Sequence, residues 1–226
     1  MKTICFALFL GLLGCAKKEE LPECPGSCTV VTGRLLTSGL NPLANATVTL
    51  EWVGGSAYAP KACKKAVTTT DANGHYRVSG FLSDAELAGG FIQAVFSPDK
   101  SKYYTIGEPA AAFYRPKRDT VYTAQDFLIP RKATITFVVT NPGQIPASNY
   151  YSINVRFSYG YNVVFNSNTS NDGISTDLSA SNASSTIDIP GGQSIVVEQR
   201  KNGTYPFPQD IITVPAGTAL TYPLTY

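Results

Sequence analysis

The sequence predicts an all-β protein with two β-sandwich domains in series. Charged residues make up only 15% of the 226 residues, and 19 Gly and 15 Pro supply turns. Apolar side chains alternate with polar ones over 46–52 and again over 151–165, which is the period of a half-buried strand. Turn residues separate many short segments of this kind, a pattern typical of a sandwich.

Residues 1–14 have the layout of a secretory signal, with Lys2, an apolar run and small residues at the end. The run is shorter than the ~20 residues that span a bilayer. Its end, Leu12-Leu13-Gly14-Cys15, resembles the lipobox of bacterial lipoproteins. The resemblance implies cleavage before Cys15 and a diacylglycerol on its sulfur. Residues 15–28 are charged and proline-bearing, which indicates a tether, and their charged run is similar to the surface-export tag of Bacteroidetes lipoproteins.

Residues 29–130 are expected to form the first domain. The alternation over 46–52 places Trp52 on the apolar face, and the stretch Gly54–Pro60 indicates a loop. Asn73-Gly74 between strand formers predicts a hairpin, because both residues accept positive φ. Ser83 and Glu86 form a capping box ahead of a short helix. Strands are expected to resume over 92–96 and 120–129.

Three blocks of this domain resemble the carboxypeptidase regulatory-like family. The blocks are Val31-Thr32-Gly33-Arg34-Leu35, then 42–50 with the motif Pro-Leu-Ala-Asn-Ala-Thr-Val-Thr-Leu, then Thr70-Asp71-Ala72-Asn73-Gly74-His75-Tyr76. They occur in the family's order. The resemblance implies a transthyretin-like sandwich that serves as a structural or binding module and carries no catalytic residues.

Residues 131–226 are expected to form a second β-sandwich domain. One parity from Tyr151 to Phe165 is entirely apolar or aromatic, which predicts either a single bent strand or two strands joined by a three-residue, glycine-bearing loop. The Asn-, Ser- and Thr-rich residues 166–186 indicate a long loop with at most a short strand. The remaining strands are expected at 187–189, 194–200, 210–214 and 219–226.

The cysteines predict one disulfide. Cys5 leaves with the signal and Cys15 carries lipid, so Cys24, Cys28 and Cys63 remain. Because Cys24–Cys28 would close a very short ring, we expect Cys28–Cys63, with Cys24–Cys63 as the alternative. The spacing of the three thiols and the single histidine, His75, does not fit a zinc site, so no metal is expected.

No catalytic constellation is evident in the sequence. His75 adjoins a turn glycine on a polar face, and no nucleophile elbow, phosphate loop or HExxH motif occurs. We therefore expect a protein that is not an enzyme and needs no cofactor. The formal net charge of +2 and the scatter of basic residues along the chain argue against a nucleic-acid partner.

The aromatic content favours binding. The alternating Tyr and Phe residues are expected to form core, so candidate ligand-binding rings are those in loops or off that parity: Tyr58, Tyr150, Tyr205 and Phe207. The leading hypothesis is a lipid-anchored envelope protein, at the outer membrane or exposed on the cell surface, that binds a glycan or an envelope protein. The alternatives are a structural subunit of a fimbria-like surface assembly and an accessory subunit of a polysaccharide-processing system.

Overall fold

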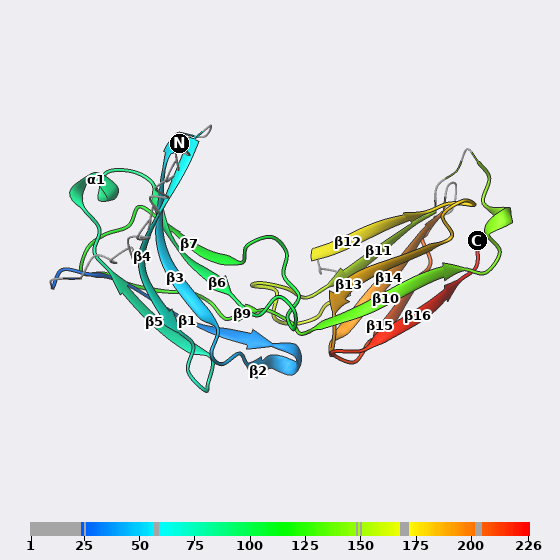
Figure 1. Cartoon of the computed structure of the whole chain (residues 1–226), viewed down its shortest axis with the longest axis horizontal. Helices are drawn as coiled ribbons and strands as arrows, with labels where there is room; N and C mark the ends of the chain where they lie inside the picture. The colour runs from blue at the N-terminus through cyan, green and yellow to red at the C-terminus, as the bar shows by residue number, and fades with distance from the viewer. Residues whose placement is uncertain are drawn as a thin grey trace, which may run out of the picture.

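A computed structural model describes residues 24, 26–56, 59–147, 149, 151–167, 172–201 and 205–226. Figure 1 shows two β lobes that meet at a bend, an N-terminal lobe and a C-terminal lobe. Each lobe contains two of the four sheets. The predicted fold class, all-β with two sandwiches in series, is confirmed.

β1 (Thr29–Thr37) is the centre of the five-stranded sheet of the N-terminal lobe. Its first half pairs with β5 (His75–Gly80), antiparallel, and with β8 (Val121–Thr123), parallel. Its second half pairs with β2 (Asn41–Pro42), antiparallel, and with β9 (Phe127–Leu128), parallel. The single strand expected over 120–129 is therefore two short strands, which pair with successive parts of β1.

The other sheet of this lobe has the order β4 (Ala59–Thr69), β3 (Thr47–Ser56), β6 (Phe91–Ser97) and β7 (Ala110–Tyr114). Trp52 lies half-buried on β3, and its Nε1 donates to the carbonyls of Glu86 and Gly89, each at 3.0 Å. These carbonyls belong to α1 (Asp84–Leu87) and the turn after it, and the predicted capping box is present. The prediction of a loop from Gly54 to Pro60 is wrong, since β3 continues to Ser56 and β4 begins at Ala59.

The predicted Asn73-Gly74 turn joins two sheets instead of closing a hairpin. Gly74 has φ of +76°, and its amide donates to the Asp71 carbonyl at 3.0 Å. The Asp71 carboxylate accepts from the amides of Asn73 and His75. β4, before the turn, pairs with β3, whereas β5, after it, pairs with β1. A strong local turn signal therefore leaves the partner of the following strand unspecified.

The C-terminal lobe packs a three-stranded sheet on a four-stranded one. The first has the order β13 (Ser184–Pro190), β10 (Lys132–Val139) and β16 (Ala219–Leu224), with β10 and β16 parallel. The second has the order β12 (Asp172–Leu178), β11 (Tyr151–Phe157), β14 (Ser194–Lys201) and β15 (Gln209–Thr213). β12 occupies part of the segment expected as a loop.

β11 ends at Phe157, although the alternation of apolar residues in the sequence continues to Phe165. Its side chains alternate between buried and half-buried up to Phe157, after which the chain leaves the sheet. Gly160 has φ of +62°, and Gly160 and Leu128 of the other lobe exchange both backbone hydrogen bonds, at 2.7 and 3.0 Å. The aromatic run therefore ends in a connection between lobes, which is neither the bent strand nor the three-residue loop that we expected.

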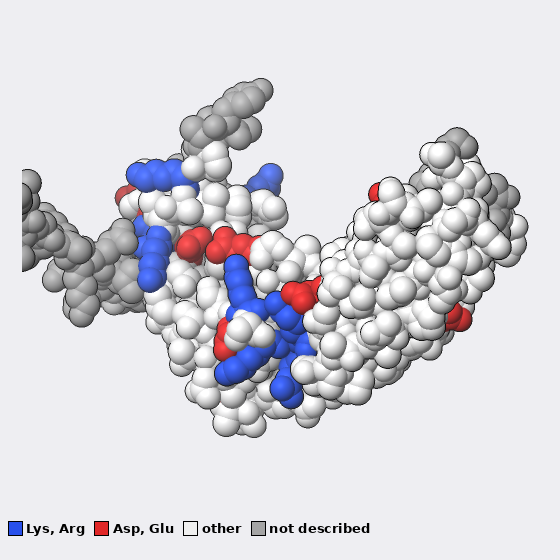
Figure 2. Space-filling view, turned by 45° about the vertical axis from the view of Figure 1, so that its right-hand side comes forward, with Lys and Arg blue, Asp and Glu red and all other residues white. Residues whose placement is uncertain are grey.

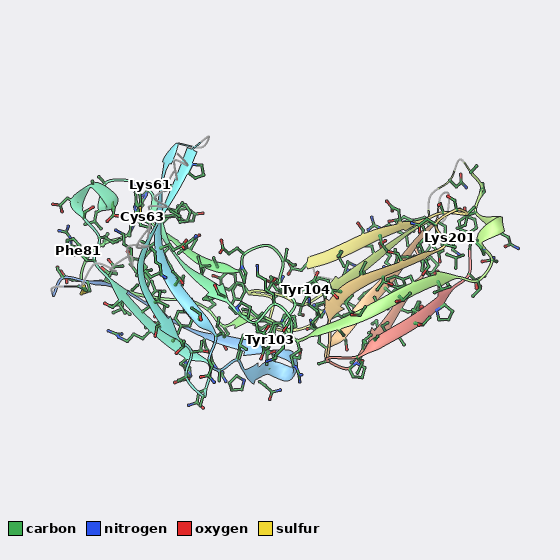
Figure 3. All side chains as sticks on the ribbon, in the orientation of Figure 1. Lys61, Cys63, Phe81, Tyr103, Tyr104 and Lys201 are labelled. Atoms are coloured by element: carbon green, nitrogen blue, oxygen red, sulfur yellow. A yellow bond between two sulfur atoms is a disulfide. The ribbon has the colours of Figure 1, made fainter. Side chains whose placement is uncertain are left out.

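The two lobes share one hydrophobic core across the bend. Tyr104, in the connection between β6 and β7, packs edge-on against Phe157 and Tyr159, with ring centroids 5.3 and 6.3 Å apart. Figure 3 shows Tyr103 and Tyr104 at this junction. Burial raises the pKa of Tyr104 to about 12. Ser38 adds a polar link, because its Oγ donates to the Gly191 carbonyl at 2.5 Å.

The predicted Cys28–Cys63 disulfide is wrong, as is the alternative Cys24–Cys63. Cys24 bonds to Cys28, with Cα atoms 5.8 Å apart, and Cys63 is a free, half-buried thiol. Gly26, at φ of +130°, lets the intervening chain reverse within the short ring. Cys63 lies on β4, where its register partner is Trp52 of β3. The short ring thus precedes β1 in the chain, and the disulfide does not link β1 to β4.

Within the described ranges, no helix combines the length and apolar character that a membrane span requires.

Candidate binding surface

Two of the four predicted ligand-binding rings lie together. Tyr205 and Phe207 occupy the connection between β14 and β15, with ring centroids 5.8 Å apart and planes at 82°. The Tyr205 residue is 87% exposed, so its ring is available to a ligand. Tyr58 and Tyr150 lie outside the described residues, as does the predicted lipidation site Cys15.

A cation covers the second ring. The Arg200 guanidinium lies 5.4 Å from the centroid of the Phe207 ring, within cation–π range. Its Nε also donates to Glu198 Oε1 at 2.6 Å. These two interactions hold the guanidinium between the ring and the carboxylate. A planar cation and two aromatic rings are therefore presented together at this end of the sheet.

Glu198 anchors the polar part of this surface. It is only 6% exposed, and its Oε2 accepts from Gln209 Nε2 at 2.7 Å. Arg156 Nη2 lies 3.8 Å from the same oxygen. Arg156 is itself fixed by a 2.7 Å hydrogen bond from Nη1 to the Ser167 carbonyl. Because both carboxylate oxygens have partners, the buried charge is compensated.

Strand register explains why these side chains share a face. On β11, Tyr151, Ile153, Val155 and Phe157 point into the core, so Arg156 points outward. In the antiparallel ladder, Glu198 lies opposite Asn154 and Gln209. The outer face of this sheet therefore carries guanidinium, carboxylate, amide and hydroxyl groups beside the two exposed rings. We call Arg156, Glu198, Arg200, Tyr205, Phe207 and Gln209 the aromatic-guanidinium surface.

This arrangement can bind without performing chemistry. Aromatic faces stack on sugar rings, and amide or guanidinium groups donate to hydroxyl and carboxylate oxygens. Glu198 is engaged on both oxygens, which leaves it poorly placed for proton transfer. His75 is exposed at the start of β5, in the other lobe.

Sequence reasoning found the two rings and missed Arg156, Glu198 and Arg200. A signal was present, because Arg156 and Arg200 both fall on the polar parity of expected strands. What the sequence lacks is the pairing of those strands, which sets them side by side.

No protein-family model and no curated protein matches the chain. Among solved structures, the chain is similar to shaft pilin SpaA from Lactobacillus rhamnosus GG, at 12% identity over 88% of this chain and 97% of that chain, with a TM-score of 0.32. It is also similar to the Streptococcal ancillary pilin, at 9% identity over 89% of this chain and 63% of that chain, with a TM-score of 0.32. For the Bacillus anthracis TIE protein the identity is 9%, over 88% of this chain and 34% of that chain, with a TM-score of 0.31. The chain thus spans about a third of the length of the TIE protein.

Proposed function

We propose that this protein is a non-catalytic binding or adhesion module of the cell envelope that recognises a glycan through the aromatic-guanidinium surface. The observation that carries the proposal is the exposed Tyr205 ring beside Phe207 and Arg200. An exposed aromatic ring can stack on a sugar ring while neighbouring polar groups bind the sugar hydroxyls. The neighbouring amide and guanidinium groups suit hydroxyl-rich partners.

The proposed location follows from the N-terminal sequence. The resemblance of Leu12-Leu13-Gly14-Cys15 to a lipobox supports a lipid anchor on Cys15, at the outer membrane or the cell surface. The tether of residues 15–28 would hold the two lobes away from the membrane. On this proposal, the membrane is the first partner and the glycan is the second.

The test is a binding screen of the chain without its lipid, residues 16–226, on a panel of polysaccharides and host glycans. Saturable binding that Tyr205→Ala weakens about tenfold or more, a loss of about 1.4 kcal/mol, supports the proposal. The matched control is Tyr114→Ala, because Tyr114 is 73% exposed and packs on Phe91 at 5.3 Å in the other lobe. A folded protein that binds nothing on the panel contradicts the proposal for those glycans.

The second candidate function is that of a subunit in a surface assembly, and the edge strand β15 favours it. Among the strands that the structure describes, β15 pairs with β14 alone, and its Ile211 is 60% exposed. An open edge of this kind is where another chain can add a strand. In this chain the support for an assembly role is this open edge. A Pro at position 211 would block such pairing, so Ile211→Pro should abolish higher-order species in crosslinking on intact cells, while Ile211→Thr should leave them.

A further inference from the structure

Basic side chains that the sequence scatters meet at the junction between the lobes. Lys100 and Lys102 lie in the connection after β6, and Arg131 and Lys132 lie at the start of β10. The Lys132 amide donates to the Lys102 carbonyl at 2.8 Å, and Tyr103 forms an isolated antiparallel bridge with Arg131. Figure 2 shows Lys and Arg gathered at this junction, while the adjoining face of the C-terminal lobe is almost uncharged. We call these four basic residues the junction cluster.

The surface is hollowed on both sides of Tyr103. One hollow, of about 450 Å³, is lined by Lys100, Tyr103 and Lys132 together with Ile187 and Asp188 of β13. The other, of about 560 Å³, is lined by Lys102, Tyr103 and Arg131 together with Thr37, Ser38, Gly39, Asn41, Gly192 and Ala216. Both volumes fall in the range of small-ligand sites. Tyr103 thus forms a shared wall, with cations on each side of it.

The charges at the junction are not balanced. Lys132 Nζ lies 2.9 Å from Asp188, and Lys102 Nζ lies 3.2 Å from Asp99. Among the described residues, the side chains of Lys100 and Arg131 have no ion-pair partner. Four cations against two carboxylates leave a local surplus of two positive charges. This surplus lets the junction attract an anion.

We propose that the junction cluster binds the carboxylate or sulfate groups of an acidic sugar chain, with Tyr103 stacking on a sugar ring. Lys100 and Arg131 supply the two charges that the protein leaves unpaired, one in each hollow. Arg131 presents a planar fork that matches a carboxylate or sulfate. Two free cations are too few for a nucleic acid, whose binding commonly neutralises several phosphates at once.

This site is separate from the aromatic-guanidinium surface. β14 begins at Ser194, next to the junction, and ends at Lys201, just before the connection that carries Tyr205. At ~3.3 Å per residue, the strand places the two sites about 20 Å apart. The inference shares with the proposed function only the class of ligand, and it does not require Tyr205 to bind.

The test is calorimetric titration of the unlipidated chain with oligogalacturonate as the carboxylate probe and heparin oligosaccharides as the sulfate probe. A neutral cello-oligosaccharide and a single-stranded DNA of similar length are run in parallel. Replacing both Lys100 and Arg131 with Gln should weaken binding of one acidic probe about tenfold or more. The control changes Lys61→Gln and Lys64→Gln on β4, which removes the same charge from exposed positions outside the junction cluster. This control and Tyr205→Ala should leave the affinity within about twofold.

Binding of an acidic probe should also weaken as salt rises, because the contact is between exposed charges. The inference is overturned if neither acidic probe binds, if the neutral sugar binds as well, or if DNA binds more tightly than both. It is also overturned if the Lys61 and Lys64 control loses as much affinity as the junction variant. Loss of acidic-probe binding in Tyr205→Ala alone would move the anion site to the aromatic-guanidinium surface and leave the proposed function standing. Conversely, if an acidic probe binds at the junction but no glycan of the panel depends on Tyr205 for binding, the proposed function is contradicted and this inference stands.

Discussion

The contact between Tyr104 and Phe157 couples the two lobes, and a double-mutant cycle measures that coupling. The rings belong to different lobes and meet edge-on at 5.3 Å. Tyr104→Leu and Phe157→Leu should each lower the free energy of unfolding by roughly 1–3 kcal/mol. An edge-to-face pair is worth about 0.5–1.5 kcal/mol beyond the area that it buries. The double variant should therefore be more stable than the sum of the single effects predicts, by about that amount.

Urea denaturation followed by tryptophan fluorescence and by far-UV circular dichroism supplies the assay. Trp52 is the only tryptophan and lies in the N-terminal lobe, so its signal reports on that lobe. Phe157→Leu changes the other lobe, yet it should move the Trp52 transition. The control cycle pairs Tyr104 with Phe137, which is equally buried but packs on Tyr222, and its coupling should be within about 0.5 kcal/mol of zero. The reasoning would be refuted if Phe157→Leu left the midpoint of the Trp52 fluorescence transition unchanged, or if the two cycles gave equal coupling energies.

Three further predictions concern stability and location. Thr70→Val should lower the free energy of unfolding by about 2–4 kcal/mol, because the buried hydroxyl donates to the Leu43 carbonyl at 2.6 Å and accepts from the Ala46 amide at 2.9 Å. Thr70→Ser keeps the hydroxyl and should lower that free energy much less in the same urea titration. Equal losses in the two variants would contradict the prediction. Burial raises the pKa of Tyr151 from 10.0 to about 12, so its contribution to stability is complete below pH 10 and is lost as the pH rises through 12. Absorbance at 295 nm should show several late-titrating tyrosines, because burial also raises the pKa of Tyr104 and others. Tyr151→Phe should lower the amplitude of that late phase by one tyrosine, and an unchanged amplitude would count against the prediction. Cys15→Ala should release the protein from the membrane fraction and abolish palmitate labelling, and a variant that stays labelled would exclude this anchor.

The core could be predicted from the sequence where burial follows a simple period. Val48 and Leu50 are fully buried, as the alternation over 46–52 predicts, because successive side chains of a strand face opposite sides. The capping box at Ser83 is equally local, since its two hydrogen bonds join residues three apart. Signals of this kind depend only on neighbours in the chain, and the structure retains them.

β12 could not be predicted in the same way. Its outward residues include Gly173, Ser175 and Asp177, and its inward residues Ile174 and Thr176 are only half-buried. Such a composition resembles a loop. The strand is held mainly by its backbone ladder to β11, whose register runs from Tyr151 opposite Leu178 to Phe157 opposite Asp172. Pairing of this kind leaves little trace in side-chain type.

The disulfide and the junction cluster could not be predicted from the sequence, for a related reason. The preference for a long disulfide loop considers only chain entropy, whereas the folded positions of Cys24, Cys28 and Cys63 decide which pair meets. Likewise, Lys102 and Lys132 stand apart in the sequence and meet only because a loop of one lobe lies along the first strand of the other. A scan of charge along the chain finds no cluster there, although the folded surface has one.

The most direct measurement of the central claim is hydrogen exchange of the protein with and without the tightest-binding oligosaccharide of the panel. Recognition through the aromatic-guanidinium surface predicts slower exchange in peptides that cover 198–210, with no change in the β3–β4 arm around Trp52. Saturating ligand that leaves residues 198–210 unprotected would contradict glycan recognition by Tyr205, Phe207 and Arg200.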